Sequence, residues 1–505
     1  MTDVVRGRAR ALARRVGAVP PGRLLLILVI AHVVLKLVFY PRSLNAPLVG
    51  DEAQYVDGAR AMSNLLRDLG SFTSPDTAEL RESVVASGWF MPGMSTLLAP
   101  LYLVVPDAGI ELLRAYTGVL TTLLLLAAVL VVRRTFGDRA AAVLLVFPGL
   151  VPMWLIFSFT SWGDLPAGLL VVVLVCTLVR VVRGFVAGTP LGFRDAAWFG
   201  TLVGVTLYLR SSTSPLLVGL FVLIALGALI WLRGKMRWQS VGALALSAVI
   251  ALGMLLPWSA AASRALDSRV TTTTTVGTAL ANAFGDRGQL CYGECDPDST
   301  IWFSPVRYAR ETARVTGVGE VEVLKQMSAY ARQDITATGY ATDVLGNLAR
   351  YAGYPAGYEN WFHPGTRHEA PGPTDVWAWP IRVVSSLLYY PFLALALVLL
   401  VVGVRRPVER QVELLVIKLA LGALLLQPFV HQASTRYWPT FAPLLAVGAV
   451  VLWQARRDRT SSVATPHGSQ TVVERRLYGG QIALAVAFVS LVVVLAILAT
   501  LGAVG

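Results

Sequence analysis

Long apolar stretches, several of them close to twenty residues, recur along this chain of 505 residues. A helix of about twenty apolar residues crosses the ~30 Å hydrocarbon core of a bilayer. Hydrophobic residues make up 55% of the chain and charged residues 14%, whereas soluble proteins carry charge on about a quarter of their residues. These features exclude a soluble enzyme, a disordered chain, a secreted disulfide scaffold and a nucleic-acid-binding factor. They predict an all-α polytopic membrane protein.

The positive charge is concentrated in short connections. The formal net charge is +13, and more than half of the 43 Lys and Arg residues lie in an N-terminal tail and five short loops, Arg6–Arg23, Arg133–Arg139, Arg180–Arg194, Arg233–Arg237, Arg405–Arg410 and Arg456–Arg476. Short basic loops at every second connection are typical of the cytoplasmic side. The distribution of charge therefore predicts which loops are cytoplasmic, and it does not indicate a nucleic-acid partner. We expect a multi-pass protein of the plasma (inner) membrane with a cytoplasmic N-terminus.

Applied to the apolar stretches, this rule predicts about eleven spans, near 23–40, 112–132, 140–159, 165–182, 195–210, 214–232, 240–258, 381–403, 411–430, 439–454 and 480–502. The predicted regions are a basic cytoplasmic tail (1–22), an N-terminal transmembrane region (23–258), a large extracytoplasmic loop (259–380) and a C-terminal transmembrane region (381–505). A first outer loop, 41–111, lies on the same side as 259–380. Long loops are usually functional.

The first outer loop contains two expected helices. Residues 94–105 are apolar but too short to span, and Pro100 lies among them, so we expect a re-entrant or interfacial helix. Before it, apolar residues recur at spacings of three and four over 56–69, which predicts an amphipathic helix lying on the membrane surface. This helix would hold Asp51 and Glu52 at its start, just above the first span.

Three carboxylates and two arginines stand out because the topology brings them to the outer membrane surface. Asp51, Glu52 and Asp164 each also suit a helix start, which is the simpler interpretation of any one of them. Arg210 and Arg436 follow spans, where arginine can also anchor among headgroups. Ionisable groups at membrane depth are costly and usually functional, and the arginine fork suits phosphate oxygens. Together they predict a site for a phosphate-bearing lipid with a base beside it.

Other polar residues have simpler explanations. Lys36 and Lys418 lie inside predicted spans, and we expect their amines to extend toward the headgroups. His363, His368 and Glu369 have a spacing that could suit a metal, but a neighbouring proline and glycine argue against the regular helix such a site needs.

The three cysteines are divided between two environments. Cys176 lies in a span and is expected to be an inert apolar filler. Cys291 and Cys295 lie on the outer loop, where oxidation is permitted, and their closeness favours a local disulfide.

Several short motifs follow one another in a characteristic order: Gly50–Tyr55 (GDEAQY), Trp89–Met94 (WFMPGM), Asp164, Leu207–Arg210 (LYLR), Pro257–Trp258, Gly277–Leu280 (GTAL) and Arg436–Pro439 (RYWP). Their order and spacing resemble the GT-C membrane glycosyltransferases, in particular the family 39-like group that includes protein O-mannosyltransferases and lipid A aminoarabinose transferases. The resemblance extends from about residue 25 to 455.

This resemblance implies a GT-C-type helix bundle with two large extracytoplasmic loops. It implies a hexosyl- or pentosyltransferase that moves a sugar, with inversion, from a polyprenyl-phosphate donor to a glycan, lipid or protein acceptor on the outer face. We expect no cofactor, although metal-using relatives leave room for a divalent cation.

The resemblance also implies a role for each matching residue. Asp51 would be the general base for the acceptor hydroxyl, and Glu52 would orient the acceptor or support Asp51. Asp164 would hold acceptor hydroxyls or, in metal-using relatives, the cation. The leaving lipid phosphate would be bound by Arg210, Arg436 and Tyr437.

Two other functions are compatible with a polytopic chain. A transporter or flippase of lipid-linked saccharides is disfavoured because the spans show no internal repeat and no paired broken helices, the usual signs of transporters. A non-catalytic subunit of a cell-envelope assembly is the third hypothesis, and dispensability of the acidic residues would favour it.

Overall fold

The computed structural model describes residues 20–45, 47–48, 51–85, 88–274, 280–281, 283–295, 303–353, 378–405, 407–431, 435–461 and 472–504. All regular structure in these ranges is helical. The predicted all-α polytopic fold is therefore confirmed. Most of the 1–22 tail, the 277–279 part of the GTAL motif and the histidines at 363 and 368 lie outside the described residues.

Nine helices of the described chain are long and apolar enough to cross a membrane. They are α2 (Pro21–Ser43), α6 (Ile110–Phe136), α9 (Asp164–Val186), α11 (Ser214–Trp231), α12 (Gly234–Ala265), α17 (Ala378–Val401), α18 (Val408–Leu425), α19 (Trp438–Ser461) and α20 (Val472–Val504). A tenth expected span is α10 (Phe193–Leu209), which has 17 residues. Short 3-10 turns η2 (Ser211–Thr213) and η5 (Gln427–Phe429) adjoin α11 and α18.

The span expected at 140–159 is not one helix. It consists of α7 (Asp138–Val146) and α8 (Pro152–Phe157), with an irregular segment between them. Proline lacks an N–H and its ring collides with the preceding turn, so Pro148 ends the first helix, and Pro152 suits the start of the second. The break exposes backbone carbonyls, and the Gly149 carbonyl accepts a hydrogen bond of 2.6 Å from His32 Nδ1 on α2.

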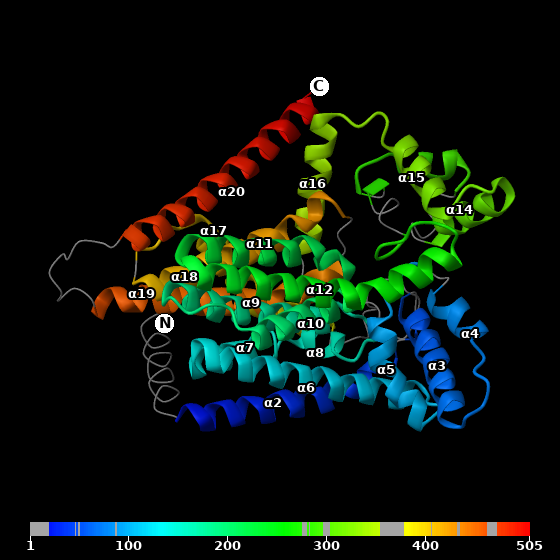
Figure 1. The fold of residues 1–505 in the computed structure, drawn as a ribbon, viewed down its shortest axis with the longest axis horizontal. Coiled ribbons are helices and arrows are strands. Elements are labelled where there is room, and N and C mark those ends of the chain that lie inside the picture. Colours follow the sequence, from blue (N-terminus) through cyan, green and yellow to red (C-terminus); the bar gives the residue numbers. More distant parts are fainter. Residues whose placement is uncertain are drawn as a thin grey trace.

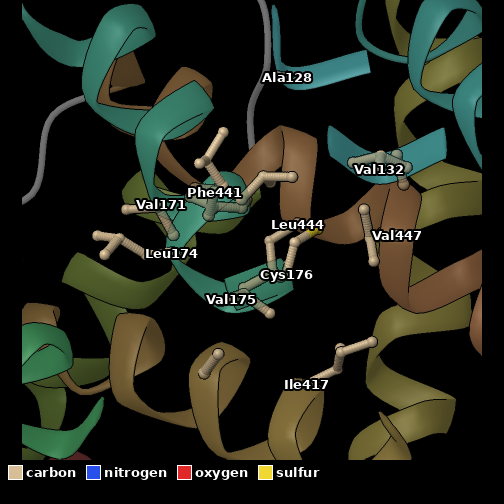
Figure 2. Packing of buried hydrophobic residues seen from close by; sticks show 14 of the residues in the cluster. Ala128, Val132, Val171, Leu174, Val175, Cys176, Ile417, Phe441, Leu444 and Val447 are labelled. Carbon is tan, nitrogen blue, oxygen red and sulfur yellow. The ribbon is translucent and has the colours of Figure 1, made fainter. Parts of the chain in front are cut away.

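Helix α9 forms the centre of the bundle. Figure 2 shows the α9 residues Val171, Leu174, Val175 and Cys176 among Val132 of α6, Ile417 of α18, and Leu444 and Val447 of α19. Because α9 is buried on all sides, apolar residues occupy every face of the helix. Cys176 is buried and free, as expected of an apolar filler.

The two intramembrane lysines are bound inside the protein. Lys36 is 6% exposed, and its Nζ donates to the Gly118 carbonyl at 2.5 Å and to Thr121 and Thr122 at 2.7 and 3.0 Å. Lys418 Nζ donates to the carbonyl of Val402 at 2.6 Å, just beyond the end of α17. The expectation that both amines extend to headgroups is wrong. Hydroxyls and unpaired helix-end carbonyls at the same depth supply the acceptors that an ammonium needs.

The two long loops lie at the same end of the bundle (Figure 1). The first contains α3 (Asp51–Gly70), α4 (Ala78–Leu80), the π-helix η1 (Arg81–Val85) and α5 (Gly93–Val104); the second contains η3 (Arg287–Gly293), α14 (Phe303–Thr316), α15 (Glu320–Ala331) and α16 (Ala337–Ala352). The short helix and the helix starting at Asp51 are present as predicted. Both run across the direction of α2 and α6 in Figure 1.

Contacts between the two loops form a single cap on the bundle. Val84 of η1 and Met91 pack against Trp258 and Ala262 at the end of α12 and against Val270. The face of α3 that carries Val56 and Ala59 is buried against α5. This cap lies over the ends of α9 and α10, where the charged residues meet.

The predicted disulfide between Cys291 and Cys295 is present. It joins Cys291 in η3 to Cys295, two residues after the end of η3. Cys291 packs against Val306 of α14 and Met327 of α15.

Candidate functional site

Four charged side chains from separate parts of the chain meet where the two long loops cover the bundle. Asp51 begins α3 and forms an ion pair with Arg436, which lies in the 3-10 turn η6 (Thr435–Tyr437). Asp164 begins α9 and forms an ion pair with Arg210, the residue that ends α10. Each carboxylate occupies the first turn of a helix, where the helix dipole favours negative charge. The structure thus brings together four of the residues expected at the site.

The two ion pairs differ in depth. The Asp51 and Arg436 side chains are 17% and 18% exposed, whereas those of Asp164 and Arg210 are 1% and 11% exposed. The first pair, the outer pair, can be reached from solvent. The second pair, the inner pair, is nearly enclosed by protein.

Two aromatic rings hold the arginines next to each other. The guanidinium carbon of Arg210 lies 3.9 Å from the centre of the Tyr437 ring, and that of Arg436 lies 5.3 Å from the same ring. Arg436 also lies 5.6 Å from the Trp162 ring. Such contacts stabilise a guanidinium over an aromatic face. Tyr437, expected at the phosphate site, therefore contacts both arginines, and Trp162 is an addition that was not predicted.

Tyr55, the last residue of the Gly50–Tyr55 motif, also belongs to the site, although no role was predicted for it. It lies one turn after Asp51 on α3, and its ring is 5.2 Å from that of Phe90. Burial first, and then the charge of Asp51, raise the pKa of the Tyr55 phenol above its usual value. The hydroxyl therefore stays protonated and can donate a hydrogen bond to a ligand.

Glu52 points away from the mouth of the site, toward a buried arginine. Its two oxygens accept from Arg114 Nη1 at 2.5 Å and Nη2 at 3.2 Å, and Oε1 also accepts from the Ser161 backbone N–H at 2.7 Å. Glu52 is 1% exposed and Arg114 0%. Arg114 was missed at the sequence level, although a charge among the apolar residues of α6 was the available signal.

The Glu52–Arg114 pair holds the turn that carries Trp162 and Asp164. Arg114 Nη1 donates to the Phe159 carbonyl at 3.1 Å, and Thr117 on the same face of α6 donates to it at 2.7 Å. Together with the Glu52–Ser161 bond, these contacts bind residues 159–161 to both α6 and α3. Both Glu52 oxygens are thus bound to protein groups, Arg114 and the Ser161 N–H.

Gly163 allows this turn to sit directly on the end of α10. A Cβ at Gly163 would overlap the backbone carbonyl oxygen of Leu209, the residue before Arg210. The absence of a side chain thus sets the close approach of the Asp164 and Arg210 backbones.

We expect Gly163→Ala to destabilise the protein by about 1–3 kcal/mol, because the two backbone segments must separate to accept the methyl group. The inner ion pair should be displaced with them. Gly219→Ala on α11 is the matched control, since nothing lies near that position. Melting temperatures of both variants measure the effect, and equal values would contradict this account of the turn.

A divalent cation does not fit the described site well. Within the described ranges, no group of three or more His, Cys, Asp and Glu side chains is placed to hold a metal. Asp51 and Asp164 are each paired with an arginine through one carboxylate oxygen, so a metal would compete with a guanidinium for each carboxylate. We therefore derive no step that uses a metal.

No protein-family model and no curated protein matches the chain. Among solved structures, it is similar to the Archaeoglobus fulgidus oligosaccharyltransferase in complex with Zn and sulfate (12% identity, TM-score 0.44, covering 91% of this chain and 53% of that chain). It is also similar to the same archaeal enzyme, AglB, with an inhibitory peptide and a dolichol-phosphate (13% identity, TM-score 0.38, 90% and 55%). A third match is ArnT from Cupriavidus metallidurans bound to undecaprenyl phosphate (15% identity, TM-score 0.32, 90% and 84%).

The chain spans about half the length of the archaeal chains it matches. At identities of 12–15% and TM-scores of 0.32–0.44, these similarities carry no conclusion about the activity of this chain.

Proposed function

We propose that this protein is a glycosyltransferase that moves a sugar from a polyprenyl-phosphate donor to a glycan, lipid or protein acceptor. The reaction takes place on the extracytoplasmic face of the plasma membrane and inverts the anomeric centre. The donor reaches the site through the bilayer, so no nucleotide-sugar site is needed. The N-terminus is cytoplasmic.

The observation that carries this proposal is the pairing of two carboxylates with two arginines at one end of an apolar helix bundle. Charges are expensive at this depth and persist where a function needs them. Arginines suit the oxygens of a phosphate leaving group, and a carboxylate beside them can accept a proton. The outer pair is also exposed enough to be reached by a ligand.

Each residue has a defined task in the proposed reaction. Asp51 takes the proton from the acceptor hydroxyl as that oxygen bonds to the anomeric carbon. The bond from this carbon to the phosphate oxygen breaks at the same time, and its electron pair stays on the phosphate. Arg210 and Arg436 stabilise the charge that develops there, and Tyr437 holds the two arginines side by side. Asp164 positions acceptor hydroxyls.

Glu52 supports this arrangement from a buried position. Through Arg114 and the Ser161 N–H it holds the turn that carries Trp162 and Asp164. It acts through other residues, so it is a positioning residue rather than a proton acceptor.

Purified protein incubated with a panel of polyprenyl-phosphate sugars and candidate acceptors tests the function. We expect at least one donor to release free polyprenyl phosphate, in an amount equal to the glycosidic product formed. Reactions without acceptor are the control for donor hydrolysis. Movement of labelled donor across vesicle membranes with no glycosidic bond formed would contradict the proposal and favour a flippase.

A further inference from the structure

The proposed base and one proposed phosphate ligand are bound to each other. Asp51 and Arg436 form the outer ion pair, with side chains 17% and 18% exposed. Separating a pair in contact with water costs little, whereas separating the inner pair would leave a charge buried without compensation. A ligand that enters from the outer end therefore meets the more separable pair first.

Both arginines of the site are already paired with carboxylates, so a phosphate meets no arginine that lacks an acidic partner. Asp51, Asp164, Arg210 and Arg436 together sum to zero formal charge. A polyprenyl phosphodiester adds one negative charge, and the phosphate that leaves carries between one and two at pH 7. Arginine binds such a group through the nitrogens of its guanidinium, and one nitrogen of each guanidinium already contacts a carboxylate. The phosphate therefore competes with a carboxylate for each arginine.

Building on the proposed function, we infer that Arg436 is exchanged between Asp51 and the donor phosphate, so that donor binding frees the Asp51 carboxylate. A carboxylate oxygen that accepts from a guanidinium is less available to accept from the hydroxyl of a sugar acceptor. Asp51 thus stays paired with Arg436 until the donor phosphate binds that arginine.

The exchange also resets the site after transfer. Asp51 now carries the proton taken from the acceptor hydroxyl, and the polyprenyl phosphate holds Arg436. When that phosphate leaves, Asp51 gives its proton to water and Arg436 pairs with the carboxylate again. Donor binding before acceptor deprotonation is the consequence.

Binding of undecaprenyl phosphate to the full chain in nanodiscs tests the exchange without requiring turnover. We expect Asp51→Asn to bind this lipid roughly three- to tenfold more tightly than the wild type, because Arg436 no longer has a competing partner. Arg436→Gln should weaken binding by about tenfold. In the Arg436→Gln background, Asp51→Asn should change the affinity by less than about twofold, because the two sites are coupled.

The double variant separates exchange from plain repulsion between Asp51 and the phosphate. Repulsion alone would give the same gain with or without Arg436, and that result would overturn the inference. Unchanged or weaker binding by Asp51→Asn, or no saturable binding by any protein, would overturn it as well. Asp57→Asn, at an exposed position on the same helix, should leave the affinity unchanged.

The outcomes also distinguish this inference from the proposed function. If the wild type transferred sugar but the effects of Asp51→Asn and Arg436→Gln on lipid affinity were additive, the exchange would be disproved and the proposed function would stand. If the two effects were coupled but no donor in the panel supported transfer, the proposed function would be disproved and the exchange would stand.

Discussion

Replacement of Asp51 by Asn is expected to reduce kcat for sugar transfer by at least about 100-fold, with insertion and melting temperature close to those of the wild type. Asparagine has nearly the shape of aspartate but cannot accept the acceptor's proton, and general-base catalysis contributes roughly 10²–10⁴-fold. The side chain is 17% exposed, so asparagine at this position keeps contact with solvent and we expect no large effect on folding. Initial rates with a donor identified from the panel measure the effect.

Asp57→Asn is the matched control, because this carboxylate lies on the same helix, is 56% exposed and pairs only loosely with Arg60 at 3.8 Å. It should retain wild-type rates. Transfer by Asp51→Asn at close to the wild-type rate would remove Asp51 from the mechanism. Tighter binding of undecaprenyl phosphate together with lost turnover is the combined signature that we expect of this variant.

Replacement of Arg114 by Met is expected to cause the largest loss of stability, about 3–5 kcal/mol. Methionine fills much of the same volume, but Glu52 would keep a buried charge without its partner, and removal of one member of a buried pair has this cost. Thermal unfolding in detergent measures it. We also expect transfer to fall, because the Phe159 carbonyl loses a donor and the turn that carries Asp164 loosens.

The double variant Glu52→Gln/Arg114→Met should recover part of this loss, because no charge then remains buried. Arg60→Met is the control, since Arg60 belongs to an exposed pair whose loss costs less than about 1 kcal/mol. If Arg114→Met melted within about two degrees of the Arg60→Met control, the buried pair would not have the role assigned to it.

Several features of the fold could be predicted from local sequence. The apolar stretches predict helices at nearly the right positions, because crossing a bilayer sets a length that can be counted. The start of α3 at Asp51 and the short α5 were also predicted, since a helix start and a 12-residue apolar run are local patterns. The break in 140–159 was missed because hydropathy outweighed the two prolines, which were the available signal.

The candidate site was predicted only in part. Asp51, Asp164, Arg210 and Arg436 were predicted to share one face, and the structure places them in two ion pairs. Which acid pairs with which arginine could not be predicted, because the partners are distant in sequence and equally compatible in charge. Tyr55 belongs to the Gly50–Tyr55 motif, but no role was predicted for it or for Trp162, since aromatic residues at a membrane surface are common.

By itself the sequence determined the helical class, the approximate positions of most helices and the small number of charges at one end of the bundle, because these follow from bilayer thickness and local backbone chemistry. The tertiary structure decided what those charges contact. Glu52 and Arg114 are 62 positions apart, and Lys36 binds hydroxyls on α6 rather than headgroups. Only packing brings such groups within hydrogen-bonding distance, and burial makes their pairing obligatory.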